Sequence, residues 1–161
     1  MKKNSSYKSF KDFKVLLVYP NIQMCEMMPY SIGLLTACLR KEGFTVDLFD
    51  TTFYVDKLND NYEAFHDYVQ EFDWKEKGRI FKSNIINDFH KKIEKFDPDL
   101  ISVSVVENTY PTAKRMIKSL PDSMKKIPII WGGVFATFAP QLILKDNIGD
   151  YICRGEGENA V

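Results

Sequence analysis

Residues 99–106 read DLISVSVV, a nearly continuous apolar run of the kind found in strands covered on both faces of a parallel sheet. Four more short apolar runs occur, at residues 14–19, 44–49, 127–131 and 150–153. Patterns with helical spacing separate these runs. Strands that alternate with helices predict an α/β fold with a doubly wound parallel sheet, because right-handed crossovers place helices on both faces. Five strands in such a sheet predict the flavodoxin-type order 2-1-3-4-5.

The connection between the second and third predicted strands, residues 50–98, holds two helical patterns instead of one. The later pattern, ending at Asp97–Pro98, is the expected crossover helix. The earlier one is an insertion at about residues 53–80, and its stripe of apolar and aromatic residues is either plain core or a docking face for another domain. We expect an N-terminal extension at residues 1–13 and a single domain over residues 14–161.

Composition narrows the class of protein. The 161 residues carry 22 basic and 22 acidic side chains, so no net field favours nucleic acid or an anionic membrane. The sequence has no apolar stretch long enough to span a membrane and no signal peptide, which predicts a cytoplasmic location. The three cysteines, Cys25, Cys38 and Cys153, are widely spaced and form neither a disulfide framework nor a C-x-x-C pair.

The sequence after the last predicted strand reads RGEGENAV. Glu156, Glu158 and Asn159 resemble the first turn of a further helix, where carboxylates suit the helix dipole. We therefore expect this chain to be the front part of a longer protein; the alternative is a tail that ends in a loop.

Ligands of open α/β sheets bind beyond the carboxyl ends of the strands, near the point where the strand order reverses. Gly132 and Gly133 directly follow the fourth predicted strand, where glycines let the backbone approach a ligand closely. Ser102 and Ser104 alternate on the third strand and so share one face. They offer space and donors to a bulky ligand, or they only relieve packing against a helix.

Three polar residues, Glu107, Asn108 and Thr109, follow at the mouth of the third strand. They are candidate ligand contacts, although Asn108 or Thr109 equally suits a helix cap. Motifs of other ligand-binding and catalytic classes are absent. The turn after the first strand reads YPNIQMCEMMPYS and holds no G-x-G-x-x-G, the fingerprint of dinucleotide binding. The chain also has neither the P-loop of nucleotidases nor the G-x-S-x-G nucleophile elbow. His66 and His90 lie within helical patterns and are interpreted as surface or satisfied histidines.

Several segments together resemble the N-terminal cobalamin-binding domain of radical S-adenosylmethionine proteins. They are VLLVYPN, PYSIGLLTACLRKEGFTVDLFDTT, PDLISVSVVENTYPTAKRMIKSL, IPIIWGGVFATFAPQLIL and DYICRGEGENA. The most specific parts are G-G-x-x-A-T-x-x-P after the fourth strand and R-G-E-G-E after the fifth. The match covers most of residues 14–160 apart from the insertion.

The resemblance implies a Rossmann-like domain with cobalamin over the strand ends, its nucleotide tail between the sheet and the neighbouring helices. It assigns Gly132 and Gly133 to the nucleotide loop, and residues 106–109 to the lower face of the corrin. The positions carried over are Asp50, Ser104, Val106, Glu107, Gly132, Gly133, Thr137, Gly155 and Glu156, with Pro20 beside them. A bulky residue at Gly133 is then expected to abolish cobalamin uptake.

Two departures from related families refine this expectation. The D-x-H-x-x-G motif of mutase-type cobalamin domains is absent, and the loop after the first strand holds no histidine, which implies base-off cobalamin without a histidine ligand. The C-x-x-x-C-x-x-C loop that binds a [4Fe–4S] cluster is also absent. The chain is therefore expected not to be catalytic alone. S-adenosylmethionine and the cluster would belong to a C-terminal radical domain, in cis or in trans, that performs methyl transfer or related radical chemistry.

A second hypothesis competes with the cofactor-holding module. In it, the domain has lost its cofactor and serves as an interaction element, with the insertion as its binding face. A flavin or nucleotide protein of the flavodoxin type is disfavoured, since the phosphate loop after the first strand is missing.

Overall fold

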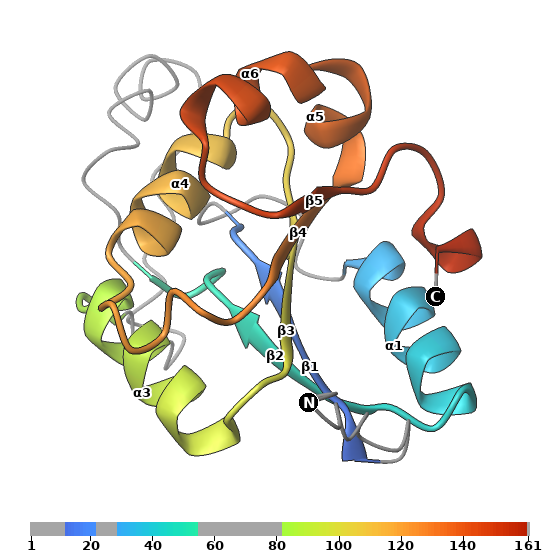
Figure 1. Cartoon of the computed structure of the whole chain (residues 1–161), viewed down its shortest axis with the longest axis horizontal. Helices are drawn as coiled ribbons and strands as arrows, with labels where there is room; N and C mark the ends of the chain where they lie inside the picture. The colour runs from blue at the N-terminus through green and yellow to red at the C-terminus, as the bar shows by residue number, and fades with distance from the viewer. Residues whose placement is uncertain (1–11, 22–28, 55–81, 161) are drawn as a thin grey trace, which may run out of the picture.

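The strands of the sheet coincide with the predicted apolar runs. The computed structural model describes residues 12–21, 29–54 and 82–160. The strands are β1 (Lys14–Tyr19), β2 (Thr45–Asp50), β3 (Leu100–Ser104), β4 (Ile129–Gly132) and β5 (Tyr151–Ile152). All four pairings are parallel and the order is β2-β1-β3-β4-β5 (Figure 1). This confirms the predicted Rossmann-like, flavodoxin-type sheet.

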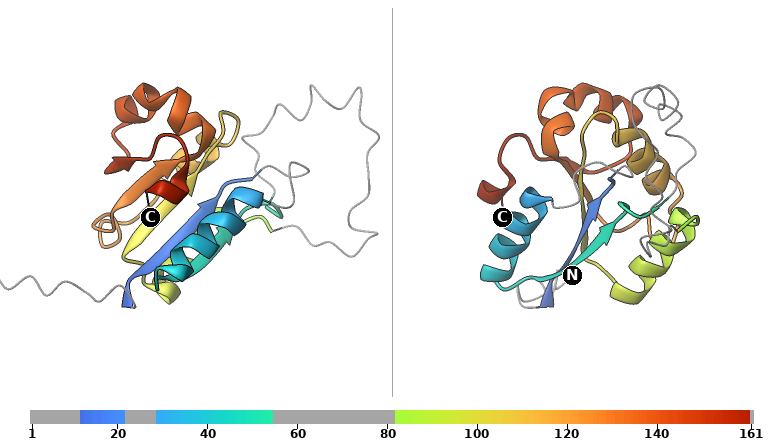
Figure 2. Two further views of the ribbon diagram at one scale, coloured as in Figure 1. Left: turned by 90° about the vertical axis from the view of Figure 1, so that its right-hand side faces the viewer. Right: turned by 180° about the vertical axis from the view of Figure 1, so that it is seen from behind.

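The helices lie on both faces of the sheet. They are α1 (Tyr30–Lys41), α3 (Ile85–Phe96), α4 (Tyr110–Lys118), α5 (Gly133–Phe138) and α6 (Pro140–Asp146), with a short 3-10 turn, η2 (Gly157–Asn159). Helix α1 covers one face, and α3 and α4 cover the other (Figures 1 and 2). None of the helices in the described ranges has the length and apolar character of a membrane span.

Most of the predicted insertion, residues 55–80, lies outside the described residues, as do His66 and Cys25. The two ends that flank it meet. Tyr54 and Lys82 form a parallel bridge, and the Lys82 amide donates to the Phe53 carbonyl at 2.8 Å. The two described ends of this segment therefore lie side by side, shortly after the end of β2.

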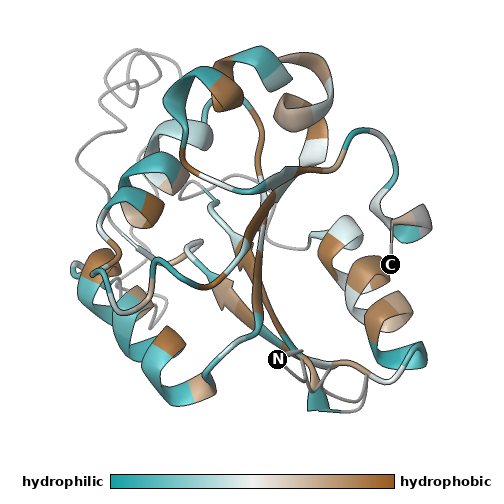
Figure 3. Cartoon of the chain, viewed as in Figure 1, coloured by the Kyte–Doolittle hydropathy of each residue, from teal (hydrophilic) through white to brown (hydrophobic). Residues whose placement is uncertain are grey.

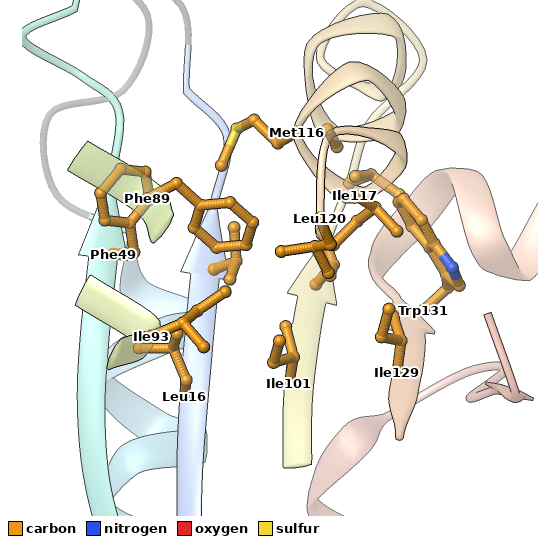
Figure 4. Close-up of a cluster of buried hydrophobic side chains, with 14 of the residues drawn as sticks. Leu16, Phe49, Phe89, Ile93, Ile101, Met116, Ile117, Leu120, Ile129 and Trp131 are labelled. Carbon is orange, nitrogen blue, oxygen red and sulfur yellow. The ribbon is translucent and has the colours of Figure 1, made fainter. Parts of the chain in front are cut away.

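The larger core lies between the sheet and helices α3 and α4, where alternate residues of each strand point. Figure 4 shows Ile93 of α3 beside Leu16, and Ile117 of α4 beside Trp131. Trp131 is fully buried, and its indole N–H donates to the Ile148 carbonyl at 2.9 Å. In Figure 3 the strands are largely brown while the outer turns of α3 are teal, as an amphipathic covering helix requires.

A smaller core lies under α1. It consists of Val15, Leu17, Ile32, Leu39 and Val46. These residues belong to β1, β2 and α1, so the helix covers only one half of this face. Among the described residues, no helix covers β3 and β4 on the same side, and this asymmetry defines the candidate site.

Candidate cofactor site

Three of the four residues that line the uncovered part of the sheet are small. On the α1 side of β3 and β4, Ser102 pairs with Ile130 and Ser104 pairs with Gly132. All four residues are half-buried. Neither serine hydroxyl donates a hydrogen bond to another described residue, so both are available as donors. We call these four residues the open strip.

Gly132 leaves space in the open strip, although neither its backbone conformation nor its neighbours require a glycine there. Its backbone is extended, with φ −136° and ψ −172°, which any residue adopts. A Cβ built there would lie 4.0 Å from the Cβ of Cys153, an ordinary contact. The protein itself has room for a Cβ at this position, so the missing Cβ leaves a cradle that a ligand can fill.

Gly133 is glycine for a different reason. Its φ is +87°, and a Cβ would lie 2.7 Å from the carbonyl oxygen of Val105 and 2.9 Å from its nitrogen. The turn from β4 into α5 is pressed against the end of β3, where the Phe135 amide also donates to the Val105 carbonyl at 3.1 Å. A bulky residue at Gly133 would therefore disturb the fold itself, and its effect on cobalamin uptake would not identify a cofactor contact.

The turn between β3 and α4 presents three of its four predicted residues outward. Val106, Glu107 and Asn108 are exposed, Val106 by 43%. Thr109 is buried, and its hydroxyl accepts from the Val106 amide at 3.1 Å and donates to the Val106 carbonyl at 3.2 Å. Thr109 is the N-cap residue of α4, as the helix-cap alternative placed it, but its hydroxyl makes no capping bond to the helix and is paired with Val106 instead.

Thr137 also has its hydroxyl paired. It donates to the Gly133 carbonyl at 3.0 Å, one turn back in α5, and accepts from the Gly155 amide at 3.0 Å. Gly155, with φ +82°, and Glu156 are both exposed in the loop after β5. The R-G-E-G-E segment is thereby joined to the helix that begins at the paired glycines.

At the ends of β1 and β2 the predicted residues have supporting positions. Pro20 is fully buried. One oxygen of Asp50 accepts from the amide of Thr52 at 2.8 Å and from its hydroxyl at 2.5 Å. Both residues therefore shape the carboxyl edge of the sheet from within.

Sequence reasoning missed three buried polar residues at this edge: Asn21, Thr51 and Thr52. The Asn21 amide donates to the Thr52 hydroxyl at 2.9 Å, and the Thr51 hydroxyl donates to the Asn21 carbonyl at 2.8 Å. The D-T-T sequence after β2 carried a usable signal, because aspartate commonly accepts from the amide two residues later.

His90 is a satisfied histidine, as predicted. It lies on α3, on the far side of the sheet from the open strip, with its Nε2 3.0 Å from the Ser119 hydroxyl. Within the described ranges, no cluster of three or more His, Cys, Asp or Glu side chains could hold a metal ion.

A hollow of about 310 Å³ lies elsewhere, between α6 and β5. Trp131, Ile143, Tyr151 and Arg154 are among its lining residues. It contains none of the predicted site residues and opens beside the edge strand, so it is separate from the open strip.

This chain is similar to a known protein family and to solved structures. The model of the B12 binding domain matches residues 26–161. A structure of the radical S-adenosylmethionine methyltransferase TsrM from Kitasatospora setae, with tryptophan substrate and an S-adenosylmethionine analogue bound, is 25% identical over 91% of this chain with a TM-score of 0.61. A second TsrM structure, with cobalamin and a [4Fe–4S] cluster bound, is 24% identical over 92% of this chain with a TM-score of 0.58, which shows the shared fold.

A relative among curated proteins is an uncharacterized methyltransferase of Pyrococcus horikoshii, 30% identical over 73 residues. That match covers 45% of this chain and 16% of the relative, and this chain spans 24% of the first TsrM chain. The family model covers most of the sequence, including all of β2 to β5 and the residues of the open strip. This chain therefore belongs to the B12 binding domain family.

Proposed function

We propose that this domain binds cobalamin along the open strip and holds it for a radical S-adenosylmethionine methyltransferase domain. The cradle at Gly132 carries the proposal, because its missing Cβ has no role in the packing of the protein itself. Family membership and the cobalamin bound in TsrM support the same conclusion.

Different residues of the site would contact different parts of the cofactor. Ser102, Ser104 and Gly132 would receive the nucleotide tail, since they combine free hydroxyls with space on an uncovered sheet face. Val106 would offer an apolar contact to the corrin at the carboxyl edge, flanked by Glu107 and Asn108. Bound cobalamin would supply cobalt-based methyl transfer.

We propose that cobalamin binds base-off without a histidine ligand. The loop after β1, PNIQMCEMMP, holds no histidine, and His90 is paired with Ser119 on the opposite side of the sheet. The S-adenosylmethionine and cluster sites would belong to another domain, since the cysteines of this chain do not form the cluster motif. Radical chemistry and methyl transfer are accordingly proposed for that domain and not for this one.

A graded series at Gly132 tests the proposal. Purified wild-type protein is titrated with hydroxocobalamin, and binding is followed by the change in the corrin absorption bands and by co-elution on gel filtration. We expect base-off bands with the wild type. Gly132→Leu should weaken binding at least about tenfold, because overfilling a packed space costs roughly 1–3 kcal/mol. Gly132→Ala, the matched control, adds only an ordinary contact and should bind more tightly than Gly132→Leu.

The urea-unfolding free energy of both variants should stay close to that of the wild type, since the extended backbone accepts any side chain. Wild-type protein that neither shifts the bands nor retains the corrin would overturn the proposal. Equal affinities of wild type and Gly132→Leu for hydroxocobalamin would show that the cofactor does not bind along the open strip.

A second experiment addresses the absence of a histidine ligand. His90→Ala should leave the affinity for hydroxocobalamin and the base-off bands unchanged, because the imidazole is paired with Ser119 away from the strip. A change in the spectrum of bound cobalamin on this substitution would show that the histidine reaches cobalt.

A further inference from the structure

The segment after β5 crosses the open side of the sheet. Residues 153–160, which we call the strap, run from the end of β5 to α1 (Figures 1 and 2). At its start, the Cys153 amide donates to the Trp131 carbonyl at 2.8 Å, and the Cys153 side chain lies beside Gly132. The strap therefore begins at the edge of the open strip.

The far end of the strap rests on α1. Gly157 lies so close that a Cβ there would be 2.8 Å from the Cδ2 atom of Leu35. Because α1 covers β1 and β2 while the open strip lies on β3 and β4, the strap joins the two halves of this sheet face.

Between these ends, one side chain holds the strap to the body of the domain. The Thr137 hydroxyl accepts from the Gly155 amide and donates to the Gly133 carbonyl, each at 3.0 Å. Gly155 has φ +82°, is exposed, and has no atom within 4 Å of the place where a Cβ would be, so the space on that side of it is open. Among the described residues, the hydrogen bond from its amide joins the middle of the strap to α5.

We propose that Thr137 is a positioning residue for the cofactor site, acting through the strap and not by touching cobalamin. Its hydroxyl already donates one hydrogen bond, to Gly133 at the start of α5, and accepts one, from Gly155 in the strap, and both segments border the cradle at Gly132. Loss of the hydroxyl would free the strap beside the open strip while leaving the sheet intact. This inference rests on the proposed cobalamin function.

The test compares Thr137→Val with Thr137→Ser. Valine keeps the shape and removes the hydroxyl, whereas serine keeps both hydrogen bonds. Hydroxocobalamin should bind Thr137→Val roughly three- to tenfold more weakly than wild type, the range expected for one net hydrogen bond. Thr137→Ser should restore affinity to within about twofold on the same reasoning.

A direct readout separates this inference from the proposed function. The Gly155 amide should exchange with deuterium faster in Thr137→Val than in wild type or Thr137→Ser, with no cobalamin present. If wild type fails to bind cobalamin, the proposed function is wrong, whatever the exchange rates. Equal cobalamin affinity in the valine and serine variants, or equal exchange at Gly155, would overturn the positioning role. If Thr137→Val does not fold, the exchange of the Gly155 amide is measured in wild type with and without hydroxocobalamin. We expect slower exchange when the cofactor is added. Unchanged exchange would contradict the positioning role of Thr137.

Discussion

Gly132 and Gly133 are neighbours in the chain, but the backbone makes different demands on them. Gly133 has φ +87° and meets the Val105 backbone, while Gly132 is extended and open. Gly133 therefore secures the fold, and Gly132 leaves room for a ligand. The pair reads as a single motif in the sequence, and the separation of its roles depends on the tertiary contacts of each residue.

Gly133→Ala should lower the free energy of unfolding by about 2–4 kcal/mol, combining the left-handed backbone penalty with overpacking against Val105. Gly155→Ala is the matched control, because it shares a positive φ of +82° but has open space around its Cβ position. It should cost only about 1–2 kcal/mol. Urea denaturation measures both values, and equal losses would show that the contact with Val105 is unimportant.

At the scale of elements, α6 is tied to α4 by one carboxylate. Asp146 accepts from the Tyr110 hydroxyl and from the Lys114 ammonium group, both at 2.6 Å. These bonds lower the pKa of Asp146 below its ordinary value, while burial and the bond to Asp146 raise the pKa of Tyr110. Because Tyr110 also packs on Trp131 and Phe135, this tie anchors α6 over the main core.

Asp146→Ala should reduce stability at neutral pH by about 1–3 kcal/mol, since the buried Tyr110 hydroxyl loses its acceptor. The folded-state pKa of Asp146 is depressed, so its contribution is present above the ordinary aspartate value of 3.8 and is lost as the pH falls through the folded value. Chemical denaturation at several pH values should therefore show the difference between wild type and variant narrowing in acid. A difference in unfolding free energy between wild type and Asp146→Ala that widens as the pH falls would show that the Asp146 carboxylate does not stabilise the fold through these bonds.

At the scale of the whole molecule, the two faces of the sheet are unequal. Helices α3 and α4 cover one face with a continuous core, while α1 covers only β1 and β2 on the other. The strap runs from the edge of the open strip, beside Gly132, to α1 on the same side of the sheet. A bound cofactor would complete this face, so binding and global stability should be linked.

Hydroxocobalamin at about one hundred times its Kd should raise the free energy of unfolding by about 2.7 kcal/mol. For a domain of this size that corresponds to an increase in Tm of roughly 5–10 °C. Differential scanning calorimetry measures the shift, and Gly132→Leu should show a smaller one at the same cofactor concentration. An unchanged wild-type Tm would contradict binding to the folded domain.

The fold was predictable because strand and helix patterns are local. Apolar runs such as that of β3 mark strands covered on both faces, and right-handed crossovers leave few possible orders for five of them. The resemblance assigns most of the proposed site to one edge of the sheet, since the motifs after β4 and β5 both follow the carboxyl ends of parallel strands.

The roles of individual residues depended on contacts between distant segments. Thr109 and Thr137 stand among the candidate cofactor residues in sequence, but their hydroxyls are paired within the protein, one inside its own turn and one with Gly155. The hydrogen bond between Asn21 and Thr51 joins the ends of β1 and β2 across 30 residues of chain, and a local sequence pattern does not predict such a contact.

The sequence by itself determined the class of fold and the order of the strands, because periodicity and connection rules act over short stretches of chain; the edge of the sheet at which we propose that a ligand binds follows from that order. Only the tertiary structure decided which half of the α1 face is uncovered, which glycine is open and which threonine holds the strap. Those properties depend on whether a neighbouring segment fills the space or the hydrogen-bonding capacity of a residue, and that is settled only when distant parts of the chain pack together.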